Sequence, residues 1–136
     1  MKDKLIMNLL NTTFTSTVQS HQRLKELSAY FGCSEDIISR FAISRSLQTG
    51  TISQDWKPSI GVEESTISNG KSIRGKTLFK SDLSLFLVML ASVEDAIDSE
   101  DVREYFGLHW ERGIELISQE VNEYDWLEYL SHSLNV

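Results

Sequence analysis

Two helical patterns that meet at a single glycine constrain the fold of this chain more than any other feature. Residues 18–31 repeat their apolar side chains at the spacing of one helix face. Gly32 ends this pattern, as glycine commonly does at the C-terminal end of a helix. Ser34 is a suitable N-cap for a second helix that runs to about residue 48. The sequence therefore predicts two consecutive helices with a tight turn between them.

A short β-branched segment precedes this helix pair. Residues 11–17 read NTTFTST, and Phe14 is their only large apolar side chain. Such a segment is typical of a short edge strand or ribbon and not of a strand inside a sheet. The segment and the helix pair together give residues 12–48 the outline of a ribbon–helix–helix-like unit, a short β ribbon plus two helices.

The remainder of the chain is mostly helical in pattern. A strongly apolar helix is predicted from about residue 81 to residue 96, and Ser99 begins another that Gly107 weakens or ends. A further helix covers residues 109–120, and Asn122 caps the last one. We predict a mainly α fold in which the ribbon–helix–helix-like unit is followed by a further three to four packed helices.

Length and composition favour one domain from residue 1 to residue 136. A chain of this size lies in the usual range for a domain, and 40% of its residues are hydrophobic. Residues 70–81 are predicted as a basic loop and residues 82–132 as the helical remainder. The single cysteine excludes an internal disulfide, and no apolar run approaches the ~18 residues of a membrane span. The sequence thus predicts a soluble cytoplasmic protein that has no membrane part.

The charged residues divide the chain into two unequal parts. Residues 1–80 hold eleven Lys/Arg and seven Asp/Glu, whereas residues 81–136 hold two Lys/Arg and thirteen Asp/Glu. Residues 71–80 carry four cations and no acidic residue. This asymmetry predicts one side that faces a polyanion, and an acidic side that is a solvated outer face or a surface for basic partners. The net charge of −7 argues against tight DNA binding by a lone monomer.

One stretch satisfies a nucleotide-binding pattern. Residues 70–77, GKSIRGKT, fit the form G-x-x-x-x-G-K-[ST], in which backbone N–H groups of a loop hold phosphates. That loop has to follow a buried strand, but the preceding residues, EESTISN, are polar and end in a turn signal. No later hydrophobic strand ends in an acidic residue that would hold magnesium. The sequence context therefore argues against nucleotide hydrolysis.

Other residues that carry chemistry do not assemble into a site by sequence. Cys33 lies in the turn between the first two helices without a histidine near it, and the three histidines are scattered. The acidic residues from Glu94 to Asp101 lack the glycine and the spacing of a calcium loop, and indicate a solvated junction between helices. No zinc spacing and no Ser/His/Asp arrangement stands out. The sequence therefore predicts a protein without catalytic activity, metal site or cofactor.

Three segments resemble one bacterial family. They are the end of the helix pair at residues 35–47, the segment NGKSIRGKTLF at residues 69–79, and the apolar helix at residues 82–90. The most specific element is the pattern R-G-x-T-L-F at residues 74–79. Over about residues 12–120 the chain resembles DndE, the small protein of the bacterial DNA phosphorothioation (sulphur modification) system.

This resemblance implies an accessory DNA-binding protein without a cofactor, which works beside a sulphurtransferase-like partner and an ATPase. It also implies a homotetramer that prefers nicked duplex DNA and holds it with lysines. In this chain Lys80 stands where the family usually has glycine after the phenylalanine, which adds a cation. The cations of the basic loop are joined by two arginines of the second predicted helix. The predicted DNA-binding residues are therefore Lys71, Arg74, Lys76, Lys80, Arg40 and Arg45.

Two other functions are compatible with the sequence. The first is an assembly or adaptor subunit that binds the partner modification proteins with little DNA affinity of its own, which the net charge of −7 favours. The second is a regulator of the ribbon–helix–helix type that reads base edges in the major groove. That function requires Thr13, Thr15 and Thr17 to point outward from a paired ribbon.

Overall fold

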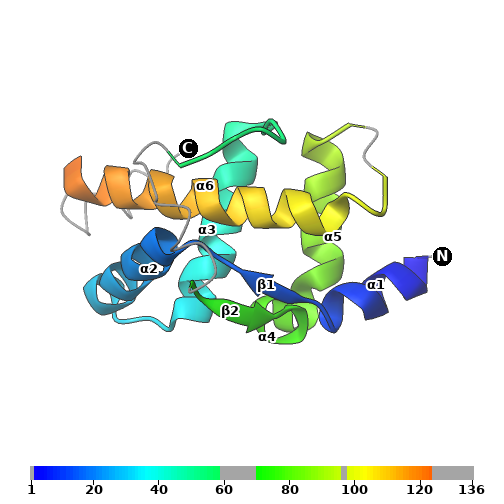
Figure 1. Cartoon of the computed structure of the whole chain (residues 1–136), viewed down its shortest axis with the longest axis horizontal. Helices are drawn as coiled ribbons and strands as arrows, with labels where there is room; N and C mark the ends of the chain where they lie inside the picture. Colours follow the sequence, from blue (N-terminus) through cyan, green and yellow to red (C-terminus); the bar gives the residue numbers. More distant parts are fainter. Residues whose placement is uncertain (1, 59–69, 96–97, 124–136) are drawn as a thin grey trace.

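One long helix runs across the middle of the fold (Figure 1). A computed structural model describes residues 2–58, 70–95 and 98–123. In chain order its elements are α1 (Lys2–Leu10), β1 (Thr13–Thr15), α2 (Val18–Phe31), α3 (Glu35–Thr49), β2 (Ser72–Arg74), α4 (Gly75–Phe79), the 3₁₀ helix η2 (Lys80–Asp82), α5 (Leu83–Val93) and α6 (Val102–Glu123). Helix α6 passes across α3, with α2 toward one end and α5 and α1 toward the other (Figure 1). The predicted mainly α fold with one small β element is confirmed.

The two helices predicted around Gly32 form as expected. The Thr17 hydroxyl accepts a hydrogen bond from the Ser20 N–H at the start of α2, and the Ser34 hydroxyl accepts one from Ile37 at the start of α3. Gly32 has φ 69°, the left-handed conformation that only glycine adopts without cost, and its N–H closes the last turn of α2. Local sequence therefore decides where both helices begin and where the first one ends.

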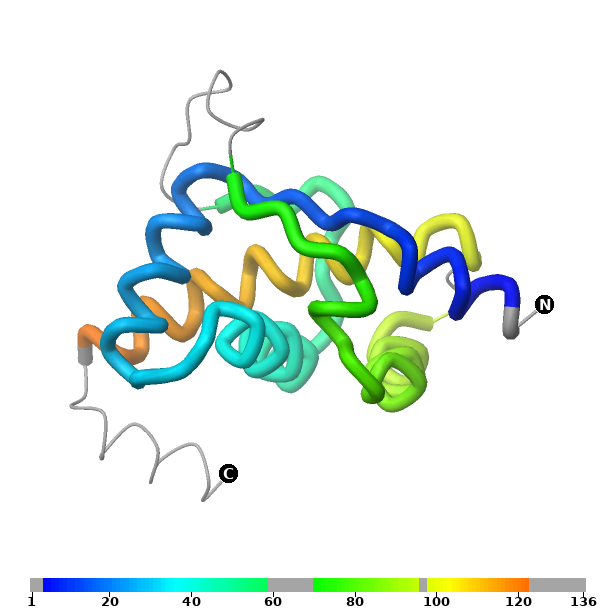
Figure 2. The backbone as a smooth tube through the Cα atoms, turned by 90° about the horizontal axis from the view of Figure 1, so that it is seen from below, coloured from blue at the N-terminus to red at the C-terminus, as the bar shows by residue number. Residues whose placement is uncertain are grey.

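The β element is a ribbon that the chain forms with itself (Figure 2). Strand β1 pairs antiparallel with β2, which aligns Thr13 with Arg74, Phe14 with Ile73 and Thr15 with Ser72. Phe14 and Ile73 are buried, so the ribbon lies with one face on the core. Thr17 is not part of this ribbon, because it caps α2. The regulator hypothesis needed Thr17 on an outward ribbon face and is therefore not supported.

The core forms where α6 lies against the helix pair. Phe106, Trp110, Ile114 and Ile117 of α6 are all buried, at the spacing of one helix face. Gly113 allows α6 to approach α3 closely, because a Cβ at this position would lie 1.8 Å from the Ala42 carbonyl oxygen of α3. The two backbones therefore touch without an intervening side chain.

Helix α6 differs from its prediction in length. The sequence predicted separate helices on either side of Gly107, but residues 102–123 form one continuous helix that also contains Asn122. A single glycine costs a helix only about 1 kcal/mol, and the buried face of α6 extends past it on both sides. The helix predicted after Asn122 lies outside the described residues.

The segment predicted as a basic loop, residues 70–81, is instead mostly regular structure. It forms β2, the short helix α4 and part of η2. Three buried apolar side chains fix it to the core, and they interrupt the cations of the sequence pattern: Ile73, Leu78 and Phe79. Helix α1 was not predicted, and its residue Leu9 is also buried. None of the helices in the described ranges is long and apolar enough to cross a membrane.

Candidate nucleic-acid interface

Three exposed cations follow one another on β2, α4 and η2. Arg74 ends β2, Lys76 lies in α4, and Lys80 begins η2. Within the described ranges none of these three side chains forms an ion pair. We call residues 74–80 the cationic segment. Its charges are available to an anionic ligand.

The cationic segment is held rigidly by the aromatic residue near its end. Phe79 is fully buried, and its ring lies 5.9 Å from that of Phe14 and 4.9 Å from that of Phe106. These contacts join α4 to β1 and α6. The exposed cations therefore project from a backbone that is fixed on its inner side.

The other three predicted DNA-binding residues are engaged within the fold. One guanidinium nitrogen of Arg40 donates to the Leu78 carbonyl oxygen at 2.8 Å and so ties α3 to α4. Arg45 pairs with Glu120 at 2.9 Å, and Lys71 pairs with Glu35 at 3.3 Å. Of the six residues, Arg74, Lys76 and Lys80 are exposed and form no ion pair within the described ranges, whereas Arg40, Arg45 and Lys71 make contacts that connect parts of the fold.

Hydroxyl groups extend the surface beside Arg74. Thr13, Thr15 and Ser72 are exposed, because they alternate along the two strands with the buried Phe14 and Ile73. Hydroxyl groups commonly donate hydrogen bonds to phosphate oxygens. The sequence pattern could not reveal this neighbourhood, because it depends on the pairing of β1 with a strand that lies far along the chain.

Many carboxylates of α6 point into the fold. Glu111 accepts hydrogen bonds from the backbone N–H of Thr17 and from the Ser20 hydroxyl. Glu115 pairs with Arg23 at 3.5 Å. The acidic part of the chain was expected to be a solvated outer face or a partner surface, and Glu111 and Glu115 differ from that expectation because they hold α2 against α6. Other acidic residues of this part, among them Glu100 and Glu104, are exposed.

Residues 14–125 match the family described as DNA sulphur modification protein DndE. This match covers most of the chain. The chain belongs to the DndE family. The resemblance suggested by residues 35–47 and 69–79 is thereby confirmed.

Two solved structures of DndE share the fold. DndE from Escherichia coli B7A, involved in DNA phosphorothioation modification, matches with a TM-score of 0.59 and 19% identity, over 79% of this chain and 97% of that chain. A DndE mutant with two glycine-to-lysine substitutions, involved in DNA phosphorothioation, matches with a TM-score of 0.57 and 18% identity. This match covers 79% of this chain and 98% of that chain. No curated protein matches the sequence.

Lys80 lies in a turn that is strained for a residue with a side chain. Its backbone has φ 52° and ψ −127°, a region that favours glycine. Among the described residues other than glycine, Lys80 alone has a positive φ. Holding a lysine there costs on the order of 1–3 kcal/mol. A glycine would fit this turn without strain, whereas Lys80 adds a charge at the cost of strain.

The residues that fit the nucleotide-binding pattern do not form a phosphate loop. Residues 72–74 in the middle of the pattern are strand β2, which pairs with β1, and Gly75 begins α4. Their backbone is therefore used in a ribbon and does not wrap around an anion. Within the described ranges, no cluster of His, Cys, Asp and Glu could hold a metal ion.

A buried polar network, which the sequence did not reveal, connects α3, α5 and α6. The Ser46 hydroxyl lies 2.8 Å from His109 Nδ1, and His109 Nε2 lies 2.8 Å from Glu94 Oε2. Arg112 donates from Nε to the Ser46 hydroxyl and from its terminal nitrogens to backbone carbonyls around Gly50. The Ser46 hydroxyl therefore donates to Nδ1, and Nε2 carries the proton that Glu94 accepts.

This network has the residue types of a hydrolase triad but serves the fold. Ser46 and His109 are fully buried, so a substrate cannot reach the hydroxyl. Glu94 was expected in a solvated junction, but it is buried and also accepts a hydrogen bond from the Ile52 N–H. The three side chains thus hold the segment after α3, which begins at residue 50, against α5 and α6.

Acidification is expected to destabilise the fold through His109. Burial lowers the pKa of His109 below its usual 6.5, although Glu94 opposes the shift. The folded state then binds fewer protons than the unfolded state, so stability from this group is present above pH 6.5 and is lost below it. Between pH 7.5 and 5.5 the urea midpoint should fall, because the free energy of unfolding decreases by at most about 1.4 kcal/mol per pH unit for one proton. His109→Gln should be less stable than the wild type at pH 7.5, and its urea midpoint should change less with pH. An equally steep fall of the midpoint in this variant would contradict the assignment to His109.

Proposed function

We propose that this DndE-family protein is a non-catalytic accessory protein of DNA phosphorothioate modification that binds the DNA backbone. The observation that carries this proposal is the cationic segment, in which Arg74, Lys76 and Lys80 are exposed and unpaired within the described ranges. Cations and hydroxyl groups on a fixed backbone suit phosphate contacts, which carry no sequence information. The backbone strain at Lys80 adds support, because a cation there costs stability.

The preferred substrate in this proposal is nicked duplex DNA, bound by a homotetramer in the cytoplasm. A nick removes part of the stiffness of the duplex, so a protein that grips both sides of it bends the DNA at lower cost. Several copies of the cationic segment on one duplex bind more tightly than one copy. Salt screens the acidic residues that lie more than about 8–10 Å from the DNA, so the net charge of −7 per chain opposes these contacts only weakly. The sulphurtransferase-like and ATPase proteins of the modification system are the proposed protein partners.

Fluorescence anisotropy with nicked and intact duplexes of one sequence, over a salt series, tests this function. We expect tighter binding to the nicked duplex, with affinity falling steeply as salt rises. Lys76→Ala and Lys80→Gly should each lower the slope of log affinity against log salt by about 0.9 for each phosphate that the variant no longer neutralises. Lys80→Gly also relieves the strained turn, so weaker binding by this variant cannot come from a weakened fold.

Lys57→Ala provides the matched control. It removes the same charge from the segment after α3, which lies at the opposite side of the molecule from β2 and α4 (Figure 1). Its affinity and salt slope should stay close to those of the wild type. Equal behaviour of Lys57→Ala, Lys76→Ala and Lys80→Gly would show that the cationic segment is not the DNA-binding surface.

An assembly subunit for the partner modification proteins is the second candidate function. The net charge of −7 favours it, because a protein with this charge is repelled by DNA outside its cationic segment. The same anisotropy series distinguishes the two functions. No binding to either duplex at low salt would support the assembly subunit, and co-purification with the partner proteins would then be the decisive measurement.

A further inference from the structure

Strand β1 has one edge that pairs with β2 and one edge that does not. The Thr12 carbonyl accepts from the Gly75 N–H, and the Ser16 N–H donates to the Lys71 carbonyl, both at 2.8 Å. In an antiparallel ladder, hydrogen-bonded and non-hydrogen-bonded pairs alternate. Thr13 and Thr15 are therefore in non-hydrogen-bonded pairs. Their N–H and C=O groups point away from β2, along the free edge of β1.

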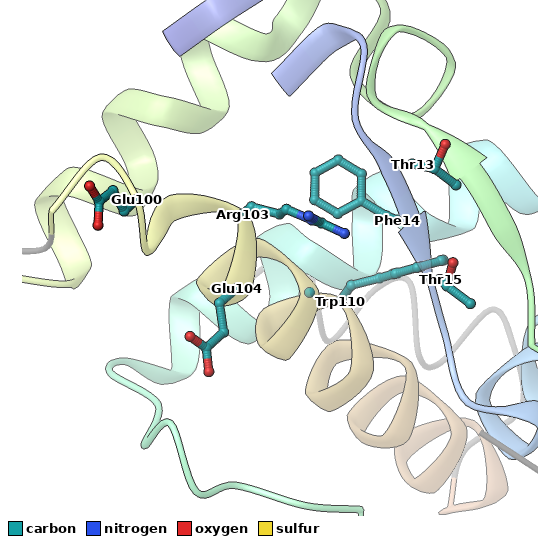
Figure 3. A pocket seen from close by; sticks show the side chains of 8 residues that line it. Thr13, Phe14, Thr15, Glu100, Arg103, Glu104 and Trp110 are labelled. Atoms are coloured by element: carbon teal, nitrogen blue, oxygen red, sulfur yellow. The ribbon is translucent and has the colours of Figure 1, made fainter. Parts of the chain in front are cut away.

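A pocket of about 400 Å³ lies beside this strand, between β1 and the first half of α6 (Figure 3). Its lining residues are Thr13, Phe14, Thr15, Glu100, Arg103, Glu104, Gly107 and Trp110. Arg103 and Trp110 extend from α6 toward β1, and Glu100 and Glu104 lie farther from the strand (Figure 3). The pocket therefore has a strand on one wall and charged side chains on the other.

Two features of α6 make this pocket suitable for a ligand. Trp110 is 1% exposed, and its indole N–H has no hydrogen-bond partner in the described part of the chain. A buried donor without a partner is uncommon, and an acceptor of a ligand reaches this nitrogen only when the wall of the pocket shifts locally. Gly107 leaves the space open, because a Cβ built there would meet no atom within 4 Å.

We propose that an extended basic peptide segment of a partner protein binds in this pocket and adds a strand to the free edge of β1. Backbone groups of the peptide would bond to the N–H and C=O groups of Thr13 and Thr15, the usual source of affinity in strand addition. A Lys or Arg of the peptide would pair with Glu100 or Glu104, which are exposed and form no ion pair in the described ranges. These two carboxylates outweigh the one cation of the lining, Arg103, and the resulting negative charge disfavours a nucleic acid, whose phosphates it repels.

This site shares Thr13 and Thr15 with the hydroxyl groups beside Arg74, but it does not include the cationic segment. The cationic segment continues from β2 into α4, whereas the pocket lies on the α6 side of β1. The peptide proposal does not depend on DNA binding. Loss of DNA binding in Lys76→Ala and loss of peptide binding in a pocket variant are therefore independent results.

An array of immobilised hexapeptides tests the proposal with the full-length labelled protein. Each spot fixes Arg, Lys, Asp or Gly at one position and holds an equal mixture of residues elsewhere. Wild type is expected to prefer spots with Arg or Lys, and Glu104→Lys to shift this preference toward Asp. Thr15→Pro removes the free-edge N–H and should weaken binding about tenfold, the effect of removing one backbone hydrogen bond.

Two matched controls separate the free edge and the pocket from unspecific effects. Thr15→Val retains the N–H and should bind like the wild type. Gly107→Leu places a side chain in the pocket and should abolish binding, whereas Gly107→Ala should bind nearly as well as the wild type. If Thr15→Pro fails to fold, the Gly107 pair still provides the test.

Four results would overturn the proposal. The first is that the wild type binds no peptide spot, and the second is that Gly107→Leu and Gly107→Ala bind peptides equally. The third is that Gly107→Leu forms a smaller oligomer than the wild type in sedimentation. The fourth is that Gly107→Leu binds DNA more weakly while its peptide binding is unchanged. The third would show that a second copy of the chain occupies the pocket. The fourth would show that a nucleic acid does.

Discussion

Gly113→Ala is expected to destabilise the fold by about 3 kcal/mol or more. The new Cβ would lie 1.8 Å from the Ala42 oxygen and 2.3 Å from the Ala42 carbonyl carbon. Both atoms belong to the α3 backbone, so no change of side-chain conformation can relieve the overlap. Helices α3 and α6 must separate instead, which opens the core around Ile43 and Ile114. Overpacking usually costs about 1–3 kcal/mol, and a backbone clash lies at or above the upper end of that range.

Gly107→Ala is the matched control for this prediction, because it makes the same chemical change in the same helix. A Cβ at Gly107 meets no atom within 4 Å, and α6 is helical there. Alanine should therefore stabilise the fold by roughly 0.5–1 kcal/mol, the difference in helix propensity. Urea unfolding followed by circular dichroism measures both variants. Shifts of the same sign would show that the contact between α3 and α6 is not as close as described.

The helix pair could be predicted from the sequence because its signals are local. Gly32 and Ser34 act on residues within four positions of themselves and do what was predicted for them, whereas Thr17, which was assigned to the ribbon segment, caps α2. The ribbon was only half predictable. β1 was expected from its β-branched residues, but its partner β2 lies almost sixty residues later, and a three-residue strand carries too little pattern to specify such a pairing.

The candidate site was partly predictable for the same reason. The cations of residues 71–80 were evident from composition, but their roles depend on distant contacts. Lys71 is near Glu35 and Arg40 reaches Leu78 only after α3, α4 and β2 have packed together. The pocket beside β1 and the network of Ser46, Glu94 and His109 likewise join residues that no sequence spacing connects. A charged residue can therefore be found by sequence, whereas its partner requires the structure.

Glu94→Ala is expected to destabilise the fold by about 2–6 kcal/mol, because each of two buried donors left without an acceptor costs about 1–3 kcal/mol. Glu94 Oε2 accepts hydrogen bonds from the Ile52 N–H at 3.0 Å and from His109 Nε2 at 2.8 Å. Both donors are buried, so the alanine variant leaves both without an acceptor. The segment after α3 would lose its attachment to α5, and His109 would lose the group that fixes its tautomer.

Two control variants separate the loss of the buried acceptor from the loss of a carboxylate charge. The measurement is urea unfolding at pH 7.5. Asp95→Ala removes a carboxylate from the next residue, which is exposed, and should change stability by less than about 0.5 kcal/mol. Glu94→Gln retains an oxygen that can accept both hydrogen bonds but lacks the charge, so its loss should lie between the other two. The predicted order of stability is therefore Asp95→Ala, Glu94→Gln and then Glu94→Ala. Equal stability of Glu94→Ala and Asp95→Ala would show that the network of Ser46, Glu94 and His109 does not hold the fold together, because a buried acceptor of two hydrogen bonds cannot be removed without cost.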